Sequence, residues 1–527
     1  MKTHVTLIRP SVLFPKFRPS AAVKPIAPLG LAYIAGAIRE AGFGITCIDA
    51  PGEALSRLRI CELDPSLLEN GLNIQEVVER IPQTTSVIGI SVMFSFDWFY
   101  VRELIRAIRA RFPASYIVLG GEHATADHDY VLRTTPEVDA CVLGEGENKI
   151  VGLLQAFEDG VPRRDLPGAA IFDRETKAVR KNPSADGRYR IRDVDSISRP
   201  AWDLLPLKEY LNFGSGHGSL NERAMPMLAS RGCPYQCTFC SSPQMWTTKW
   251  KARNIDDVFD EIKNYIRDFG INRIEFYDLT VIVDGKWILE FCRRLREENL
   301  GISWALPSGT RTEALTEEVL RAIRESGCVK LTYPLESGNP KINKLIKKRI
   351  NYKHSLASMR AAVNAGIIVK STTIIGLPFH TWKDVFIEYL FALRLAWIGA
   401  SDIAFFSFAP YPGSELHDQL VRDGKIIKDE NYPAWLRKVF PANFTNGSSW
   451  CPAFSASTVR YLCLLGMAQF YLFQYLIRPQ RLFYSLYRIF SGRPLTTLEL
   501  GLTGTVQRAI QRRRILLLGR SGQVAGA

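Results

Sequence analysis

The sequence predicts an α/β protein: an N-terminal doubly wound (flavodoxin- or Rossmann-like) domain, then a partial (β/α)6 barrel and a helical C-terminal region. Apolar runs alternate with helical stretches over residues 1–150, strand–helix repeats recur between residues 225 and 408, and the last part of the chain combines apolar runs with arginines. With 527 residues, the chain is too long for one ordinary core. We expect domains at 1–150 and 224–420, a linker at 151–223, and the helical region at 421–527.

The first domain is predicted from short, almost uninterrupted apolar runs. The expected strands are His4–Ile8, Ile45–Asp49, Val87–Val92, Tyr116–Leu119 and Asp139–Leu143, and the expected helices are Leu29–Ala41, Ile74–Ile81 and Trp98–Arg111. Strands of this kind are buried on both faces, which is typical of a parallel sheet covered by helices.

Glycine and small polar residues follow three of these strands. They are Ser91 after the third strand, the run Gly120, Gly121, Glu122, His123, Ala124 and Thr125 after the fourth, and the run Gly144, Glu145, Gly146 and Glu147 after the fifth. Ligands of doubly wound sheets bind beyond the carboxyl ends of the strands, and glycine lets a backbone approach them closely. Because no Gly-x-Gly-x-x-Gly follows the first strand, a dinucleotide ligand is disfavoured.

Residues 151–223 read as a crossing between domains. A helix is expected near Ile150–Phe157, and a polar, proline-punctuated stretch extends from Leu166 to Pro206. This composition is typical of an ordered linker.

Regular alternation returns at residue 225. The expected strands are 225–230, 272–278, 302–306, 329–335, 367–375 and 402–408, with helices at 255–268, 285–298, 316–326, 354–365 and 382–397. Six strand–helix units are fewer than the eight of a closed barrel, and the active site should lie at the C-terminal ends of the strands.

Polar and glycine-containing segments fall at those strand ends. They are Tyr277-Asp278, Ser308 with Arg311, Glu336-Ser337-Gly338, Gly376-Leu377-Pro378 and Pro410-Tyr411-Pro412-Gly413. Taken singly, an acid or a Ser-Gly pair after a strand is more often a helix cap. Their recurrence after successive strands favours a ligand site.

Cys233, Cys237 and Cys240 stand in one loop, after the apolar run 225–230. Three thiolates at this spacing can bind three irons of a cubane cluster and leave the fourth iron open. A structural zinc site would need a fourth Cys or His at finger-like spacing, and the next cysteine is Cys292. Unrelated cysteines in a reduced protein are the remaining alternative, which Gly232 and Pro234 in the same loop disfavour.

These motifs resemble two linked families. The cysteine spacing, with Phe239 before the last cysteine, resembles the radical S-adenosylmethionine (SAM) superfamily. The Gly-Gly-x-His-Ala-Thr and Gly-Glu-Gly-Glu segments, with Pro28–Tyr33 in the first helix, resemble the cobalamin-binding domain that precedes many radical SAM domains.

The resemblance implies a set of cofactors and contacts. A 4Fe-4S cluster would be held by Cys233, Cys237 and Cys240, with SAM on its open iron. Glu336, Ser337, Ile375 and Gly376 would contact SAM, together with Asp278 and Phe239; only one acid follows the second strand, where the family usually has two. Cobalamin would bind at the strand ends of the first domain.

The role of His123 stays open. The Asp-x-His-x-x-Gly motif that presents a cobalt-binding histidine in other cobalamin enzymes is missing, so the family resemblance implies cobalamin without a protein histidine on cobalt. His123 is either a cobalt ligand or a loop residue hydrogen-bonded near the corrin. A purely structural flavodoxin-like domain is the alternative for this whole unit.

The combination implies an enzyme that methylates an unactivated carbon or phosphorus of a biosynthetic small molecule, with electrons from an external flavodoxin- or ferredoxin-type donor. An enzyme of the same architecture that cyclises or oxidises a tetrapyrrole or lipid is the alternative, and a cobalamin and iron–sulfur sensor is the non-enzymatic one. No residue stands out as a general acid or base.

The C-terminal region is basic and apolar. The chain carries a net charge of +14, and residues 455–527 hold ten arginines and one acid. Arg478, Arg481, Arg488 and the triplet Arg512-Arg513-Arg514 punctuate apolar helical runs, which fits a membrane surface better than nucleic acid. The cysteine usage and the lack of an N-terminal signal pattern favour a cytoplasmic protein.

The apolar run Val459–Ile477 has three interpretations: a helix buried in the domain, a helix at a membrane interface, or a spanning helix. An interfacial helix would suit an enzyme that takes a lipid, isoprenoid or tetrapyrrole from a membrane. A lid that closes over a soluble substrate would show the same pattern.

Overall fold

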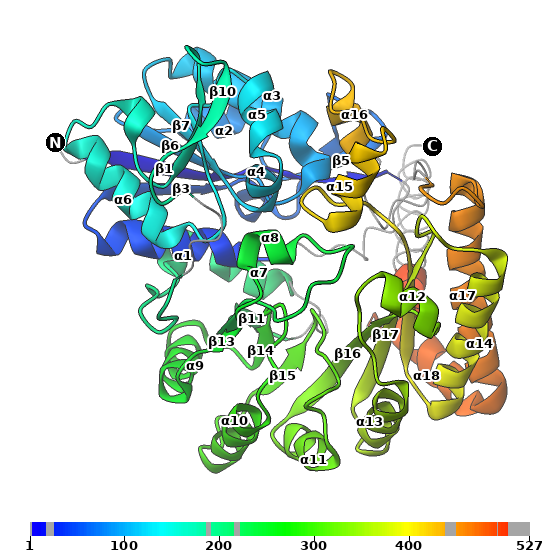
Figure 1. The fold of residues 1–527 in the computed structure, drawn as a ribbon. Coiled ribbons are helices and arrows are strands. Elements are labelled where there is room, and N and C mark those ends of the chain that lie inside the picture. The colour runs from blue at the N-terminus through cyan, green and yellow to red at the C-terminus, as the bar shows by residue number, and fades with distance from the viewer. Residues whose placement is uncertain are drawn as a thin grey trace, which may run out of the picture.

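The computed structural model describes residues 3–16, 26–185, 191–214, 222–437, 449–492 and 494–503. Two parallel sheets organise these residues, one in the N-terminal domain and one in the barrel, and a group of helices flanks the last barrel strands (Figure 1). The expected triplet Arg512-Arg513-Arg514 lies outside the described residues.

The first sheet has the order β10-β9-β8-β7-β6-β1-β3. Its parallel strands confirm the predicted doubly wound domain; they are β1 (His4–Arg9), β3 (Gly44–Asp49), β6 (Val87–Ser91), β7 (Tyr116–Gly120) and β8 (Ala140–Val142). The helices between them are α1 (Leu29–Glu40), α2 (Ile74–Arg80), α3 (Trp98–Arg111), α4 (Glu122–Ala126), α5 (His128–Thr134) and α6 (Glu147–Glu158). The strand order reverses between β1 and β6, where a ligand crevice is expected.

The predicted linker is wrong for part of its length. β9 (Ala169–Asp173) and β10 (Ala178–Lys181) extend the first sheet by antiparallel pairing, so this domain continues past residue 150. β9 pairs with the edge of β8 through its backbone, and its first three residues are buried. The rest of the segment includes α7 (Leu207–Phe213), which packs beneath the first domain.

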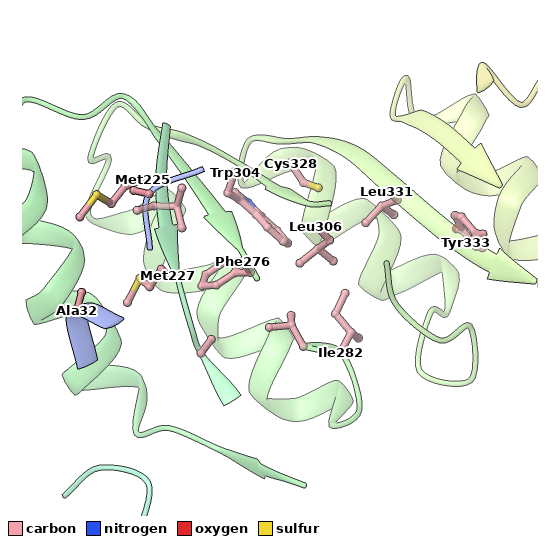
Figure 2. Close-up of a cluster of buried hydrophobic side chains, with 14 of the residues drawn as sticks. Ala32, Met225, Met227, Phe276, Ile282, Trp304, Leu306, Cys328, Leu331 and Tyr333 are labelled. Atoms are coloured by element: carbon pink, nitrogen blue, oxygen red, sulfur yellow. The ribbon is translucent and has the colours of Figure 1, made fainter. Parts of the chain in front are cut away.

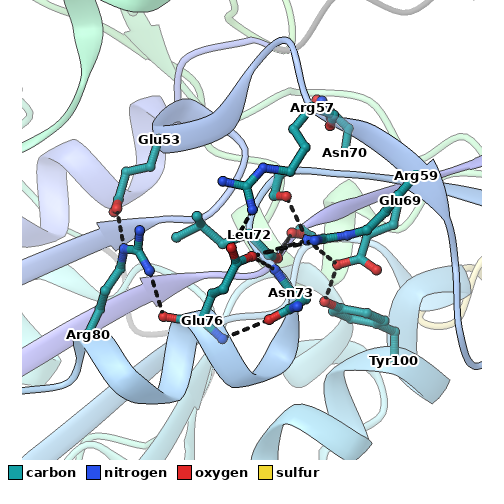
Figure 3. Close-up of polar contacts among 12 residues, drawn as sticks. Glu53, Arg57, Arg59, Glu69, Asn70, Leu72, Asn73, Glu76, Arg80 and Tyr100 are labelled. Atoms are coloured by element: carbon teal, nitrogen blue, oxygen red, sulfur yellow. Dashed lines mark hydrogen bonds and ion pairs between the residues drawn. The ribbon is translucent and has the colours of Figure 1, made fainter.

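A small antiparallel sheet was not predicted. It consists of β2 (Val12–Pro15), β5 (Leu67–Asn70) and β4 (Leu58–Ile60). Figure 3 shows the polar network that joins it to α2 and α3: the buried Glu69 accepts a 2.7 Å hydrogen bond from the Tyr100 hydroxyl and pairs with Arg59 at 3.3 Å. Glu76 and Asn73 form a capping box at the start of α2.

The second sheet confirms the partial barrel. Its six parallel strands lie in chain order: β11 (Ala224–Met227), β14 (Arg273–Phe276), β15 (Ser303–Leu306), β16 (Cys328–Glu336), β17 (Ile368–Ile375) and β18 (Asp402–Ser407). The covering helices are α9 (Ile255–Phe269), α10 (Gly285–Glu297), α11 (Glu317–Glu325), α13 (Tyr352–Asn364) and α14 (Trp382–Ile398). Shorter elements at the strand ends are β12 (Ser230–Arg231), β13 (Lys251–Ala252), α8 (Ser242–Trp246) and α12 (Pro340–Leu345).

One apolar core runs from the barrel into the first domain. Met225, Phe276, Trp304 and Leu331 come from successive barrel strands, and Ala32 of α1 belongs to the same cluster (Figure 2). The shared core fixes the barrel against the first domain by apolar packing.

The helical C-terminal region begins with α15 (Glu415–Arg422) and α16 (Tyr432–Leu436) and continues with α17 (Ala456–Ile477) and α18 (Pro479–Phe490). α17 packs on α14 and β18, so one side of the predicted apolar run is buried, while Tyr461 and Leu476 on its other side are exposed. No helix among the described residues has the length and apolarity to cross a bilayer.

Arg231 joins the barrel to the first domain through a buried ion pair. Its guanidinium donates to Glu147 at 2.7 Å and lies 3.7 Å from Glu145, and its side chain is only 6% exposed. The rings of Tyr33 and Trp246 lie 5.1 and 5.3 Å from its central carbon. Both glutamates come from the segment after β8, so a single cation fixes that segment next to β12.

We predict that Arg231→Met destabilises the protein by roughly 3–5 kcal/mol, because it leaves two buried carboxylates without a cation. Denaturant unfolding of the cofactor-free chain, followed by circular dichroism, measures the effect. The matched control is Arg296→Met, which breaks an exposed pair with Glu325 and should cost about 0–1 kcal/mol. Equal effects of the two variants would contradict a structural role for the buried pair.

Candidate active site

The three cysteines lie in the loop between β12 and α8, at the C-terminal end of the barrel sheet. Gly232, at the start of the loop, has a φ of 88°, a left-handed conformation that favours glycine. The loop is held at both sides, because the Thr238 amide donates to Ile346 at 3.1 Å and the Thr238 carbonyl accepts from the Leu416 amide at 2.9 Å. The barrel thus shapes the cysteine loop through segments more than a hundred residues away in sequence.

The thiols of Cys233, Cys237 and Cys240 share one electrostatic environment. Burial raises the pKa of each, and the neighbouring thiols raise it further, whereas nearby Lys348 and Arg311 lower the pKa of Cys233 and Cys237. Among the described residues, no three His, Cys, Asp or Glu side chains are grouped to hold a single metal ion. The donor set, three soft sulfurs in one loop, fits a cluster that takes each thiolate on a different iron.

Lys348 is a site residue that the sequence analysis missed. Its buried ammonium donates to Glu336 at 2.9 Å and lies 5.7 Å from the centre of the Phe239 ring. It therefore places a positive charge between the cysteine loop and the end of β16. The Lys347-Lys348-Arg349 run was the only sequence signal, and such a run normally reads as a solvated surface.

Glu336 has a strained backbone. Its φ is 63°, an uncommon left-handed conformation for a residue other than glycine, and it follows an irregularity in the pairing of β16 with β17. Besides Lys348, its carboxylate accepts a 3.0 Å hydrogen bond from Thr372. Strain of this kind gathers at ligand sites, because the surrounding structure must hold the residue in place.

Ser337 faces the opposite way from the cysteine loop, towards α14. Its side chain is fully buried, and its hydroxyl donates to Glu388, which also accepts from the Gly338 amide at 2.6 Å. Burial raises the pKa of Glu388 to about 7. The Ser337 side chain therefore holds the end of β16 against α14, next to Glu336.

Ile375 and Gly376 end β17. Ile375 is fully buried, and its carbonyl accepts from the Phe408 amide at 2.7 Å. Gly376 has a φ of 87°, and a Cβ there would lie 3.1 Å from Val459 of α17. The close approach of α17 thus requires glycine at this turn.

Asp278 braces the strand that leads to the cysteine loop. Its carboxylate accepts hydrogen bonds from the Ala229 amide, at 3.1 Å, and from the Ser230 hydroxyl. Burial raises its pKa to about 6, and these hydrogen bonds oppose that rise. These contacts hold the start of β12 in place, next to the cysteine loop.

The strand ends of β6 and β7 leave room for a bulky ligand. Ser91 and Gly120 are paired residues at the ends of these strands, and a Cβ built on Gly120 would meet no atom within 4 Å. Met93 and Phe94, which follow β6, are about half exposed (46% and 55%). This open, apolar rim fits the broad corrin ring of cobalamin.

The next residues after β7 turn inward. Gly121 has a φ of 105°, and a Cβ there would lie 2.6 Å from the Val92 carbonyl oxygen. Ala124 is buried in the domain core. Thr125 accepts from the Gly144 amide at 3.0 Å and donates to the Gly121 carbonyl at 2.8 Å, so it ties the loops after β7 and β8 together.

His123 is also buried, at 1% exposure. Its Nδ1 lies 2.9 Å from the Ser95 hydroxyl, its ring packs on Trp98, and burial lowers its pKa to about 4. The imidazole is thus held inside the domain, and both interpretations of His123 stay predictions.

The cysteine loop and the first domain meet at two places. Ser241, next to Cys240, donates to Glu122 at the start of α4. Arg231, two residues before Cys233, pairs with Glu145 and Glu147, whose segment also packs Gly146 on Ile34. Glu145 and Glu147 therefore join the two halves of the site, and their contact with cofactor stays a prediction.

Comparisons with known proteins agree with this arrangement. Residues 227–389 match the radical SAM superfamily model, and residues 21–154 match the B12-binding domain model. The chain is 30% identical, over 76% of its length and 80% of the relative's, to an uncharacterized methyltransferase of Pyrococcus horikoshii.

Two further relatives carry named activities. A cytidylyl-2-hydroxyethylphosphonate methyltransferase of Streptomyces wedmorensis is 27% identical over 77% of this chain and 79% of that one. An anaerobic magnesium-protoporphyrin IX monomethyl ester cyclase of Cereibacter sphaeroides is 27% identical over 80% and 64%.

Among solved structures, the radical SAM methyltransferase TsrM of Kitasatospora setae, with tryptophan and a SAM analogue bound, shares the fold. The TM-score is 0.61 at 16% identity, with 80% of this chain and 76% of that one covered. The chain therefore belongs to the radical SAM superfamily, among its members with a B12-binding domain, and is an enzyme whose cofactors are a 4Fe-4S cluster, SAM and cobalamin.

Proposed function

We propose that this enzyme transfers a methyl group to an unactivated carbon or phosphorus atom of a small molecule. The observation that carries the proposal is the joining of the two halves of the site: Arg231 and Ser241 of the cysteine loop contact Glu147 and Glu122 of the first domain. A radical formed in one half and a methyl group held in the other must meet at one substrate, and such contacts fix the distance between them.

When bound, the cluster and SAM supply a carbon-centred radical, and cobalamin supplies a methyl carrier. The chain's own part is to hold and orient these groups. Cys233, Cys237 and Cys240 hold the cluster, and the Glu336 carboxylate, fixed by Lys348, faces the amino or hydroxyl groups of SAM. The open space at Gly120 and the apolar rim of Met93 and Phe94 receive the corrin.

The proposed substrate is an apolar small molecule such as a lipid, isoprenoid or tetrapyrrole. An external flavodoxin- or ferredoxin-type protein supplies electrons, and the C-terminal helices make peripheral contact with a membrane. We place the units at 1–185 for the first domain with β9 and β10, 224–420 for the barrel and 421–527 for the helical region.

A second candidate is cyclisation or oxidation without methyl transfer. The similarity to a magnesium-protoporphyrin ester cyclase favours it. The two functions share all three cofactors. They differ in that methyl transfer uses a further SAM molecule as the source of the methyl group.

Product analysis separates these functions. After anaerobic reconstitution with iron, sulfide and hydroxocobalamin, the enzyme is given SAM, a reductant and candidate substrates. Methyl transfer predicts both 5'-deoxyadenosine and S-adenosylhomocysteine, with one added methyl in the product by mass spectrometry. Deoxyadenosine without S-adenosylhomocysteine would instead support the cyclase.

Each of Cys233→Ala, Cys237→Ala and Cys240→Ala should abolish deoxyadenosine formation, because two thiolates hold the cubane poorly. Iron content and the visible absorption of the cluster should fall together with activity. Cys292→Ala is the matched control, since this cysteine is buried in α10, away from the loop. Retention of a full cluster by the three variants would refute the ligand assignment.

Lys348→Met should lower the cluster's reduction potential and slow deoxyadenosine formation about tenfold, equivalent to roughly 1.4 kcal/mol, because a positive charge beside two thiolates is lost. Redox titration and initial rates measure the two effects. Lys347→Met is the control, because its ammonium pairs with the exposed Glu415. An unchanged potential in Lys348→Met would show that the lysine acts only on Glu336.

A further inference from the structure

Three helices at one side of the barrel expose large apolar side chains. On α14, Trp382, Phe386, Leu390 and Trp397 recur at intervals of four and seven residues, which places them on one stripe of the helix. A barrel helix normally turns such a stripe inward. Here the opposite side of α14 already packs on the barrel, so the helix carries apolar side chains on two sides.

The two C-terminal helices continue this surface. Tyr461, Leu465, Leu472 and Leu476 form a stripe on α17, and Phe483, Tyr484, Tyr487 and Phe490 form another on α18. Together with the four residues of α14 these side chains are between 50% and 72% exposed, and we call the set the apolar face. Contiguous exposed patches of this kind mark interaction sites.

The apolar face is rigid. Tyr389 of α14 donates to the Leu462 carbonyl of α17 at 2.7 Å, and Gln469 of α17 donates back to the Tyr389 carbonyl at 3.1 Å. Trp382 packs edge-on against Phe454, just before α17, with ring centres 4.9 Å apart. Figure 1 shows α14, α17 and α18 side by side at one edge of the molecule.

The exposed charged side chains of these helices are all cationic. The carboxylates of Asp384 and Glu388 on α14, and of Glu499 after α18, are buried, whereas Lys383 and Arg394 are exposed on the α14 stripe. Arg478 and Arg481 donate to backbone carbonyls at the end of α14, and within the part of the chain that the structure describes neither pairs with a carboxylate.

We propose that the apolar face docks the enzyme on an anionic lipid bilayer. Tyrosine and tryptophan rings suit the boundary between headgroups and acyl chains, and uncompensated cations attract anionic headgroups. A second copy of the chain fits less well, because a two-fold interface would bring the same cations together with no exposed carboxylate from these helices to pair with them.

A basic groove lies at the end of the apolar face. It has a volume of about 820 Å³, lies between α11, α13 and α14, and is lined by Arg321, Arg324, Arg360 and Arg394 beside Trp397, with only Glu317 and Glu325 as acids. Excess positive charge next to an exposed tryptophan suits a lipid phosphate at the level of the headgroups.

Helix α17, which carries part of the apolar face, also reaches the active site through its buried side. Val459 of α17 touches Gly376 at the end of β17, where the SAM contacts are proposed. Docking would therefore present the barrel's active-site end to molecules dissolved in the bilayer. This last step rests on the proposed apolar substrate, and docking itself deepens the peripheral membrane contact proposed above for the C-terminal helices.

Vesicle binding tests the proposal on the full-length reconstituted enzyme, without SAM or reductant, so the result is independent of catalysis. We expect the enzyme to sediment with phosphatidylglycerol-containing vesicles and more weakly with pure phosphatidylcholine. Phe483→Ser with Tyr487→Ser should weaken binding by about tenfold or more, and raising the salt from about 0.1 M to about 0.5 M should weaken it severalfold.

The matched control is Leu58→Ser with Ile60→Ser, two exposed apolar residues of β4 in the first domain, which should bind like the parent. Circular dichroism verifies the fold of both double variants. The proposal is overturned if the parent does not bind anionic vesicles, or if both double variants bind equally. It is also overturned if gel filtration shows a dimer that Phe483→Ser with Tyr487→Ser dissociates, because the face would then be a self-interface.

Discussion

The ion pair of Arg231 with Glu147 and Glu145 is the constraint on which the site depends. A guanidinium this deeply buried is stable only with carboxylates beside it, and here both carboxylates come from the other domain. Arg231 stands two residues before Cys233, so the position of this proposed cluster ligand is set by the segment after β8. The cysteine loop and the segment after β8 therefore form one structural unit, although they belong to different domains.

The barrel supports this unit from behind. Asp278 braces β12, Glu388 braces Ser337 and Gly338, and Thr372 and Lys348 hold Glu336 in its left-handed conformation. Asp278, Glu336, Lys348 and Glu388 are buried, so their hydrogen bonds fix one geometry at each strand end. The open side of the six-stranded sheet is flanked by α17, whose contact with Gly376 places a C-terminal helix against the active-site end.

Much of the fold could be predicted from the sequence, because buried parallel strands have a distinctive composition. The strands from His4 to Leu143 and from residue 225 to 408 were recognised from apolar runs. The strands β2, β4 and β5 were not recognised, because they are short and include polar residues. Glu69 and Asn70 are such residues, and they find their hydrogen-bond partners only in the folded chain. β9 and β10 were missed as well, because they are short and lie in a polar stretch of the sequence.

Within the site, the cysteines could be recognised from their spacing in the sequence. Lys348 could not, because only the folded chain brings it next to Glu336. The partnership of Arg231 with Glu147 joins residues 84 apart in sequence and left no local pattern.

The anchoring of Thr238 has a consequence for how the enzyme is made. The cysteine loop takes its shape from hydrogen bonds to Ile346 and Leu416, both far downstream. During synthesis the N-terminal domain emerges and folds first. The cysteines leave the ribosome long before residue 416 does, so the loop passes through a period as an unshaped peptide with three accessible thiols. Delivery of iron and sulfide to a finished site must therefore wait for the end of the barrel, and protection of those thiols from oxidation is needed in the interval.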